Sequence, residues 1–197
     1  MGCSLNLLAA SALFVWSAPF LIRVHGMNTA EAGAWLGMTT GVGGIAGIVL
    51  GGLAAQRLAR TDPARLLRVP AIASALTVPF VALFLTLPAS SAPVMKLGAT
   101  FFSTCLLGPV VAVTQTLAKV RIRALASAPV TLVVNLVGAG LGPLTVGVAS
   151  DVLAGSFGPS ALRYALRVPT VTALLGAALC FTRGARHVTS ELERAVE

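Results

Sequence analysis

The segment "WLGMTTGVGGIAGIVLGG", residues 35–52, contains seven glycines but no charged residue and no proline. In water, glycine is a poor helix former that costs about 1 kcal/mol per site relative to alanine. The segment nevertheless lies in an uncharged run, 32–56, that is long enough to cross a bilayer as a helix. Helices in lipid associate through close backbone contact, for which small residues are needed. The segment therefore predicts a transmembrane helix that packs closely against a neighbour.

The rest of the chain repeats this pattern of long uncharged runs. Only 10% of its 197 residues are charged, whereas a soluble domain carries about a quarter. Charged residues are absent from 1–22, 32–56, 69–95, 97–118 and 124–150, and from a shorter run, 168–182. These runs predict an all-α polytopic membrane protein with helices over about 3–22, 32–55, 69–88, 94–118, 126–150 and 162–182. We expect a six-helix domain over 1–184 and a polar cytoplasmic tail over 185–197.

The basic residues lie between the uncharged runs, and their distribution predicts the orientation of the chain. With a cytoplasmic N-terminus, ten of the 14 lysines and arginines fall in cytoplasmic segments. The other side then carries four, namely Arg23, Lys96, Arg163 and Arg167. Because cytoplasmic loops carry an excess of basic residues, we expect a multi-pass protein of the cell (inner) membrane with both termini in the cytoplasm. The loops also explain the net charge of +8, so no nucleic-acid partner is expected.

Two of the expected helices resemble each other in sequence. The second contains "GGIAGIVLGGLAAQRLA" and the fifth contains "NLVGAGLGPLTVGVASDVLA". Each is the middle helix of a set of three and is rich in glycine. Because each set has three helices, the second copy must cross the membrane in the inverted sense. A 3+3 inverted repeat of this kind is a recurring plan in secondary transporters.

The glycines of the second helix recur at spacings of three and four residues, which places them on one helix face. This face comprises Gly37, Gly41, Gly44, Gly47 and Gly51. Static helix packing explains such a face, because small residues allow two backbones to approach closely. A smooth surface along which one helix slides against another explains it equally well. Both interpretations remain open at this point.

No group of residues in the sequence indicates catalysis or metal binding. The three cysteines, Cys3, Cys105 and Cys180, are far apart and have no metal-binding spacing. The two histidines, His25 and His187, fall in a link and in the tail. We therefore expect no enzymatic activity, no cofactor and no metal site.

The polar residues expected at membrane depth are neutral, and some are candidates for a solute pathway. The amides of Gln115 and Asn135 need a partner or a watery cavity, because an amide is not satisfied by its own helix backbone. Thr39 and Thr114 are further candidates in the same membrane runs. The alternative is that these groups form interhelical hydrogen bonds, each worth about 1 kcal/mol. No charged residue is expected at mid-depth, so no coupling carboxylate is predicted.

Several segments, taken in order, resemble a known family of transporters. The sequence "GGLAAQRLAR", residues 51–60, is similar to the cytoplasmic loop signature Gly-x-x-x-Asp-Arg-x-Gly-Arg of the major facilitator superfamily. Gly52, Arg57 and Arg60 match this signature, whereas Gln56 replaces the aspartate and Ala59 the second glycine. Further similar segments are "PFLIRVHGMNTAEAGAWLG", "RIRALASA", "NLVGAGLGPLTVGVASD" and "FGPSALRYAL". Together they resemble the C-terminal six-helix half of a spinster-like transporter.

This resemblance implies a twelve-helix transporter made of two six-helix halves, with a central substrate site and alternating access. The solute is expected to be a small organic or amphipathic molecule. The expected partners are the lipid bilayer and either a second six-helix half or a homodimer partner. The chain would then be a subunit of a split transporter, a homodimerising half or a truncated reading frame. The alternative function is that of a non-transporting membrane remnant or an interaction scaffold.

Overall fold

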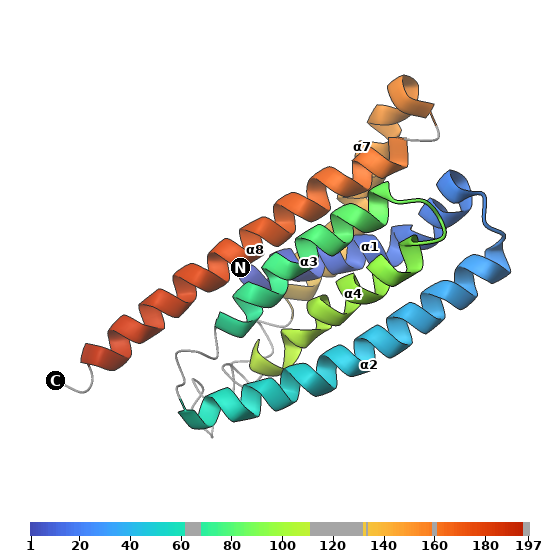
Figure 1. Cartoon of the computed structure of the whole chain (residues 1–197). Helices are drawn as coiled ribbons and strands as arrows, with labels where there is room; N and C mark the ends of the chain where they lie inside the picture. The colour runs from blue at the N-terminus through green and yellow to red at the C-terminus, as the bar shows by residue number, and fades with distance from the viewer. Residues whose placement is uncertain (62–67, 111–131, 133, 159–160, 195–197) are drawn as a thin grey trace.

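The computed structural model describes the chain except for residues 62–67, 111–131, 133, 159–160 and 195–197, and the described part is a bundle of helices (Figure 1). Its elements in chain order are α1 (Gly2–His25), α2 (Thr29–Thr61), α3 (Arg68–Thr86), α4 (Ala92–Cys105), a π-helical segment η3 (Leu136–Gly140), α7 (Leu141–Phe157) and α8 (Ala161–Arg194). The prediction of an all-α chain is confirmed.

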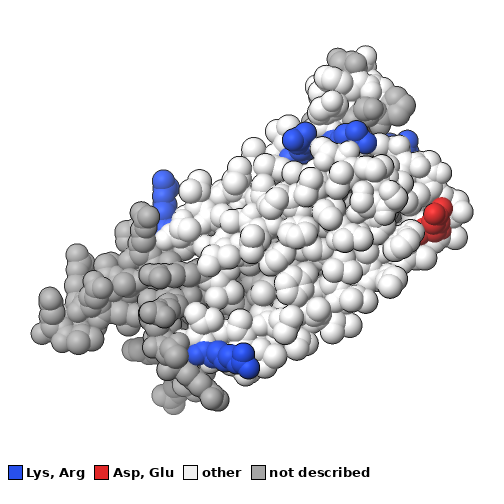
Figure 2. All heavy atoms as spheres, viewed as in Figure 1, with Lys and Arg blue, Asp and Glu red and all other residues white. Residues whose placement is uncertain are grey.

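Five spans of the described chain are long and apolar enough to cross a membrane. They lie in α1, in α2, in α3, across η3 and α7, and in α8. Charged side chains on the face shown in Figure 2 gather toward the two ends of the molecule and leave a broad uncharged band between them. An uncharged band flanked by charges is the surface expected of a protein that spans a bilayer.

The start of the first helix and the end of the last membrane segment lie at the same end of the bundle. A Cβ atom placed on Gly2 would lie 3.1 Å from the ring of Phe181. Figure 1 shows both chain termini toward this end, where α2 also ends and α3 begins. This arrangement fits an even number of membrane crossings, and the assignment of this end to the cytoplasm stays a prediction.

The helices of the two sets of three that the sequence predicts pack against each other across the sets. The second helix of the first set, α2, packs on α4, which begins the second set, while η3 and α7 pack on α1. Likewise α3 packs on α4, and α8 packs on α1. The two last helices, α3 and α8, also contact each other. This pairing is the one expected of an inverted repeat.

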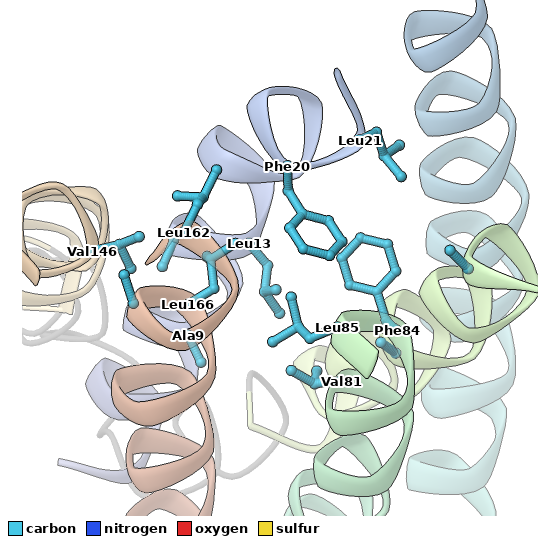
Figure 3. Packing of buried hydrophobic residues seen from close by; sticks show 14 of the residues in the cluster. Ala9, Leu13, Phe20, Leu21, Val81, Phe84, Leu85, Val146, Leu162 and Leu166 are labelled. Atoms are coloured by element: carbon cyan, nitrogen blue, oxygen red, sulfur yellow. The ribbon is translucent and has the colours of Figure 1, made fainter. Parts of the chain in front are cut away.

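The apolar core lies between α1, α3 and α8, toward the end of the bundle that contains the link from α3 to α4 (Figure 3). The rings of Phe20 and Phe84 are its largest members, and their centroids are 5.3 Å apart. Leu13, Leu85 and Leu166 fill the space around them. This core fixes α1 relative to α3, and these two helices carry part of the candidate site.

The glycines of α2 that were expected to share one face fall into two groups. A side-chain atom at Gly47 would collide with Thr104 and the carbonyl of Phe101, and one at Gly51 would collide with the backbone of Cys105. Together with Gly43, these glycines allow α2 to approach α4 closely, as small residues do in membrane helix pairs. The remaining glycines of the predicted face have open space around the Cβ position, and they are Gly37, Gly41 and Gly44.

Four of the described helices end later than the uncharged runs predict, namely α1 at His25, α2 at Thr61, α7 at Phe157 and α8 at Arg194. The second was expected to end near residue 55, but α2 continues to Thr61, because the segment "AAQRLAR" consists of good helix formers and is followed by Asp62–Pro63. The last was expected to end near residue 182, but α8 continues to Arg194. The expected tail over 185–197 is therefore helical as far as residue 194. Charge marks the edge of the membrane and not the end of a helix.

The π-helical segment η3 precedes Pro143 and is held against α1. Proline has no N–H group to donate to the preceding turn, so the hydrogen-bond pattern is interrupted there. The Ser11 hydroxyl donates a hydrogen bond to the carbonyl of Gly138 over 2.7 Å. The Trp16 Nε1–H donates to the carbonyl of Pro143 over 2.9 Å. Gly138 and Gly142 have no room for a side chain, since Leu7 and Leu8 of α1 lie against them.

Candidate functional site

Lys96 is the only buried charged side chain in the part of the chain that the structure describes, with 7% of its surface exposed. It lies in the second turn of α4, which begins at Ala92. Its Nζ atom is 5.6 Å from the centre of the Phe84 ring. The sequence analysis counted Lys96 among the basic residues of the non-cytoplasmic side, at the start of the helix predicted over 94–118, and did not predict that it is buried.

A cavity of about 330 Å³ begins at Lys96 and is walled by several helices. Residues from Leu7 to Phe14 of α1 form one wall, and residues from Ala99 to Thr104 of α4 form another. Thr40, Thr77 and Leu174 add contacts from α2, α3 and α8. Phe14 is close to the middle of α1, so the cavity extends well into the bundle from the end where Phe84 lies.

A second cavity, of about 410 Å³, shares Phe14, Thr40 and Lys96 with the first. Its wall on α2 includes Gly37 and Gly41, which have no side chain and have open space at their Cβ positions. These two glycines leave α2 backbone exposed in front of Lys96. Two members of the predicted glycine face therefore line a cavity instead of contacting a helix within this chain.

The stability of the fold does not account for a lysine at this position. Removing an ammonium group from water costs several kcal/mol unless charges or hydrogen-bond acceptors compensate. The cation–π contact with the Phe84 ring offsets on the order of 2 kcal/mol of this cost. Within the described residues, Phe84 is the one electrostatic partner found for Lys96.

The hydroxyl groups in the cavity fall into two classes. Thr77 donates to the carbonyl of Ala73 in its own helix over 2.8 Å, and Thr104 similarly donates to the carbonyl of Thr100 over 2.9 Å. Three other hydroxyls of the cavity make no hydrogen bond with the described part of the chain, namely those of Thr40, Thr100 and Ser103. Because a threonine in a helix ordinarily bonds to its own backbone, these groups are unusual and are available to a ligand.

The structure describes two of the four pathway residues predicted from the sequence. Thr39 is 3% exposed, donates to the carbonyls of Trp35 and Leu36, and does not line either cavity. Asn135 is exposed and directly precedes η3, and it is not among the residues that line the two cavities. Thr114 and Gln115 lie outside the described residues.

The residues that match the loop signature all lie on α2, because this helix continues to Thr61. Gly52 faces Gly108, and a Cβ atom on Gly108 would lie 2.8 Å from the Cα of Gly52. Arg57 is exposed, and Arg60 is described only as part of the helix backbone. A Cβ atom on Gly52 would meet no other atom within 4 Å, so the close approach depends on the missing side chain of Gly108 and not on that of Gly52.

The sequence does not single out Lys96 or Thr40 as site residues. A lysine near the end of a membrane helix ordinarily extends its ammonium group to the interface, so Lys96 gives no distinct signal. The available signal is that Lys96 interrupts an otherwise uncharged stretch from Val69 to Ala118. Thr40 follows Thr39 directly, and one residue turns a helix by about 100°, so membrane depth alone does not tell which of the two threonines faces the cavities.

Sequence comparison finds one clear relative. No family profile matches the chain. Over 174 residues the chain is 33% identical to a protein of Mycolicibacterium smegmatis described as an MFS-type efflux pump. The matching region covers 88% of this chain and 40% of that protein.

Structure comparison finds the same fold in a bacterial homologue of the human lysosomal transporter Spinster, in two inward-facing forms. The unoccupied form matches with a TM-score of 0.72 and 22% identity, over 94% of this chain and 44% of that one. The occupied form matches with a TM-score of 0.67 and 22% identity, over 94% and 46%. The chain thus spans less than half the length of each protein that it matches here.

Proposed function

We propose, since the chain belongs to the major facilitator superfamily and has the fold of one half of such a transporter, that it works as half of a transporter. It moves a small organic or amphipathic solute across the cell membrane by alternating access. The second half is another six-helix unit or a second copy of this chain. The loop signature and the helix order support its assignment as the C-terminal half, and the distribution of basic residues supports a cytoplasmic position for both termini.

The cavity pair at Lys96 is the observation that supports this proposal. Polar groups of α1, α2 and α4 line it, whereas the glycines Gly37 and Gly41 leave α2 bare beside it. A solute that crosses by alternating access needs walls on both sides of its path, and one six-helix unit supplies one side. A second unit placed against this face would close the path. The predicted residues Thr114, Gln115 and Asn135 are proposed to contribute to the same path.

Vesicle uptake tests this proposal. The chain is reconstituted alone and together with a co-expressed six-helix half, and uptake of radiolabelled anionic, neutral and cationic organic solutes is measured. We expect uptake of at least one solute class by the pair, and none by vesicles that contain the partner half alone. A stable complex that moves no solute in any combination would favour the scaffold function instead.

A further inference from the structure

We propose that Lys96 and the two cavities it borders form a binding site for an organic anion. The ammonium group pairs with the acidic group of the ligand, and the apolar walls hold its carbon body. This inference deepens the proposed transport function and rests on it, because it names the class of solute that the half-transporter accepts.

The charge of the site selects an anion. Among the residues that the structure describes, Lys96 is the only charged side chain that lines either cavity. The chain has six acidic residues, and none lies between Asp62 and Asp151, so α3 and α4 carry no carboxylate that could neutralise it. Each helix that lines the cavities with Lys96, namely α1, α2, α3 and α8, contributes apolar or hydroxyl-bearing residues there. A ligand carboxylate, sulfonate or phosphate would supply the missing counter-charge.

The shape of the site provides room for a carbon body beside that charge. The larger part of the first cavity is walled by Leu7, Leu13, Phe14 and Leu174, together with alanines of α1 and α4. The second cavity stays open in front of Lys96 because Gly37 and Gly41 place no side chain there. A small inorganic anion would leave these apolar walls unfilled.

The three hydroxyls without hydrogen bonds provide donors for the same acidic group. Thr100 and Ser103 lie one and two helical turns from Lys96 along α4, and Thr40 lines both cavities from α2. Oxygens of an anion accept hydrogen bonds from hydroxyls as well as from an ammonium group. A lysine whose only role was to contact the Phe84 ring would not need hydroxyl donors around its ammonium group.

Equilibrium binding to the full chain in nanodiscs tests this inference without any transport step. The probes are radiolabelled naphthalene-2-sulfonate and its neutral analogue naphthalene-2-sulfonamide, which share one ring system and differ in charge. We expect saturable binding of the sulfonate at least tenfold tighter than that of the sulfonamide. Lys96→Met should lose this preference, and Lys96→Arg should retain most of it. Arg167→Met, which removes an exposed charge from α8, should behave like the unmodified chain.

A variant that fills the cavity separates loss of binding from loss of folding. Gly41→Leu places a side chain where the Cβ position has open space, so the fold should persist while both probes lose binding. Folding of every variant is checked by circular dichroism and size-exclusion chromatography.

Equal affinity of the folded Lys96→Met variant and the unmodified chain for the sulfonate would overturn the inference. So would the absence of saturable sulfonate binding to the folded, unmodified chain. Charge-selective binding without uptake in vesicles would retain the anion site and reject the transport function. Uptake that does not depend on Lys96 would retain the transport function and reject the anion site.

Discussion

Gly44 and Gly47 are three residues apart on α2 and have opposite surroundings. Gly47 lies against Phe101 and Thr104 of α4, whereas the Cβ position of Gly44 has open space. The same residue type therefore has two uses on one helix. One group of glycines, which includes Gly47, allows α2 to pack closely on α4. The other, which includes Gly44, places no side chain on the α2 surface beside the cavity, and this surface is proposed to face the second half.

Substitution of these two glycines should separate the two uses. Gly47→Leu forces a side chain into the backbone of α4, and overpacking of this kind costs roughly 1–3 kcal/mol or more. We expect a clear fall in the midpoint of thermal unfolding in detergent, followed by tryptophan fluorescence. Gly44→Leu and the exposed control Ile48→Leu should leave that midpoint nearly unchanged. Equal effects of Gly47→Leu and Gly44→Leu would show that the division of the glycine face is wrong.

The site residues were predictable from the sequence only in part, because helix rotation and side-chain direction decide them. The spacing rule grouped Gly44 with Gly47, yet α4 leaves room for a side chain at Gly44 and none at Gly47. Thr39 was chosen as a neutral polar residue at membrane depth; its hydroxyl is satisfied by its own helix, while the adjacent Thr40 lines the cavities. Lys96 was counted only as a basic residue of the non-cytoplasmic side, because an ammonium group near a helix end ordinarily reaches water.

At the scale of elements, the uncharged runs predicted the helices well but not their ends. α2 and α8 continue past the last apolar residue because helix propensity does not change at the membrane edge. The interruption before Pro143 was predictable as a kink from the missing N–H group, but the form it takes, a π-helical segment, depends on contacts with α1. Those contacts are carried by Ser11 and Trp16.

The indole hydrogen bond should contribute to the stability of the contact between α1 and α7. Trp16→Phe removes the donor to the carbonyl of Pro143, and loss of such a bond costs about 1 kcal/mol. We expect a lower midpoint of thermal unfolding, measured by circular dichroism. Trp35→Phe is the matched control, because Trp35 is 42% exposed and its indole N–H makes no hydrogen bond within the described part of the chain. Equal midpoints for the two variants would contradict a stabilising role for the Trp16 hydrogen bond.

At the scale of the whole molecule, the two ends of the bundle can be identified, and the chain forms one wall of the proposed transport path. Gly2 and Phe181 lie together, so the first and last membrane segments meet at one end. The cavities at Lys96 lie beside an α2 surface that carries no covering helix from the described chain at Gly37, Gly41 and Gly44. Both features are those expected of one half of a major facilitator transporter.

The orientation of the bundle gives a prediction about surface labelling. The excess of basic residues predicts that both termini lie in the cytoplasm. In a chain whose three cysteines are replaced by serine, single cysteines introduced at His25 and Ser91 should react with an impermeant maleimide from outside intact cells. A tag at either terminus should be reached only after the cells are opened. A C-terminal tag that is accessible from outside would contradict the six-crossing topology.

The chain purified alone should be incomplete. Exposing the polar groups of the cavity to hydrocarbon without partners costs several kcal/mol. We therefore expect either a dimer in detergent or a poorly stable monomer. Light scattering coupled to size-exclusion chromatography gives the mass of the protein component, and a monodisperse monomer that resists heating would count against this expectation.

The most direct test of the half-transporter account is solute uptake by sealed vesicles that contain the chain with and without a second six-helix half. Where the second half is a separate chain, the account predicts uptake above that of empty vesicles only when both halves are present. Where it is a second copy, uptake should appear only under conditions in which crosslinking shows a dimer. Uptake by vesicles that hold this chain as a verified monomer would contradict the account.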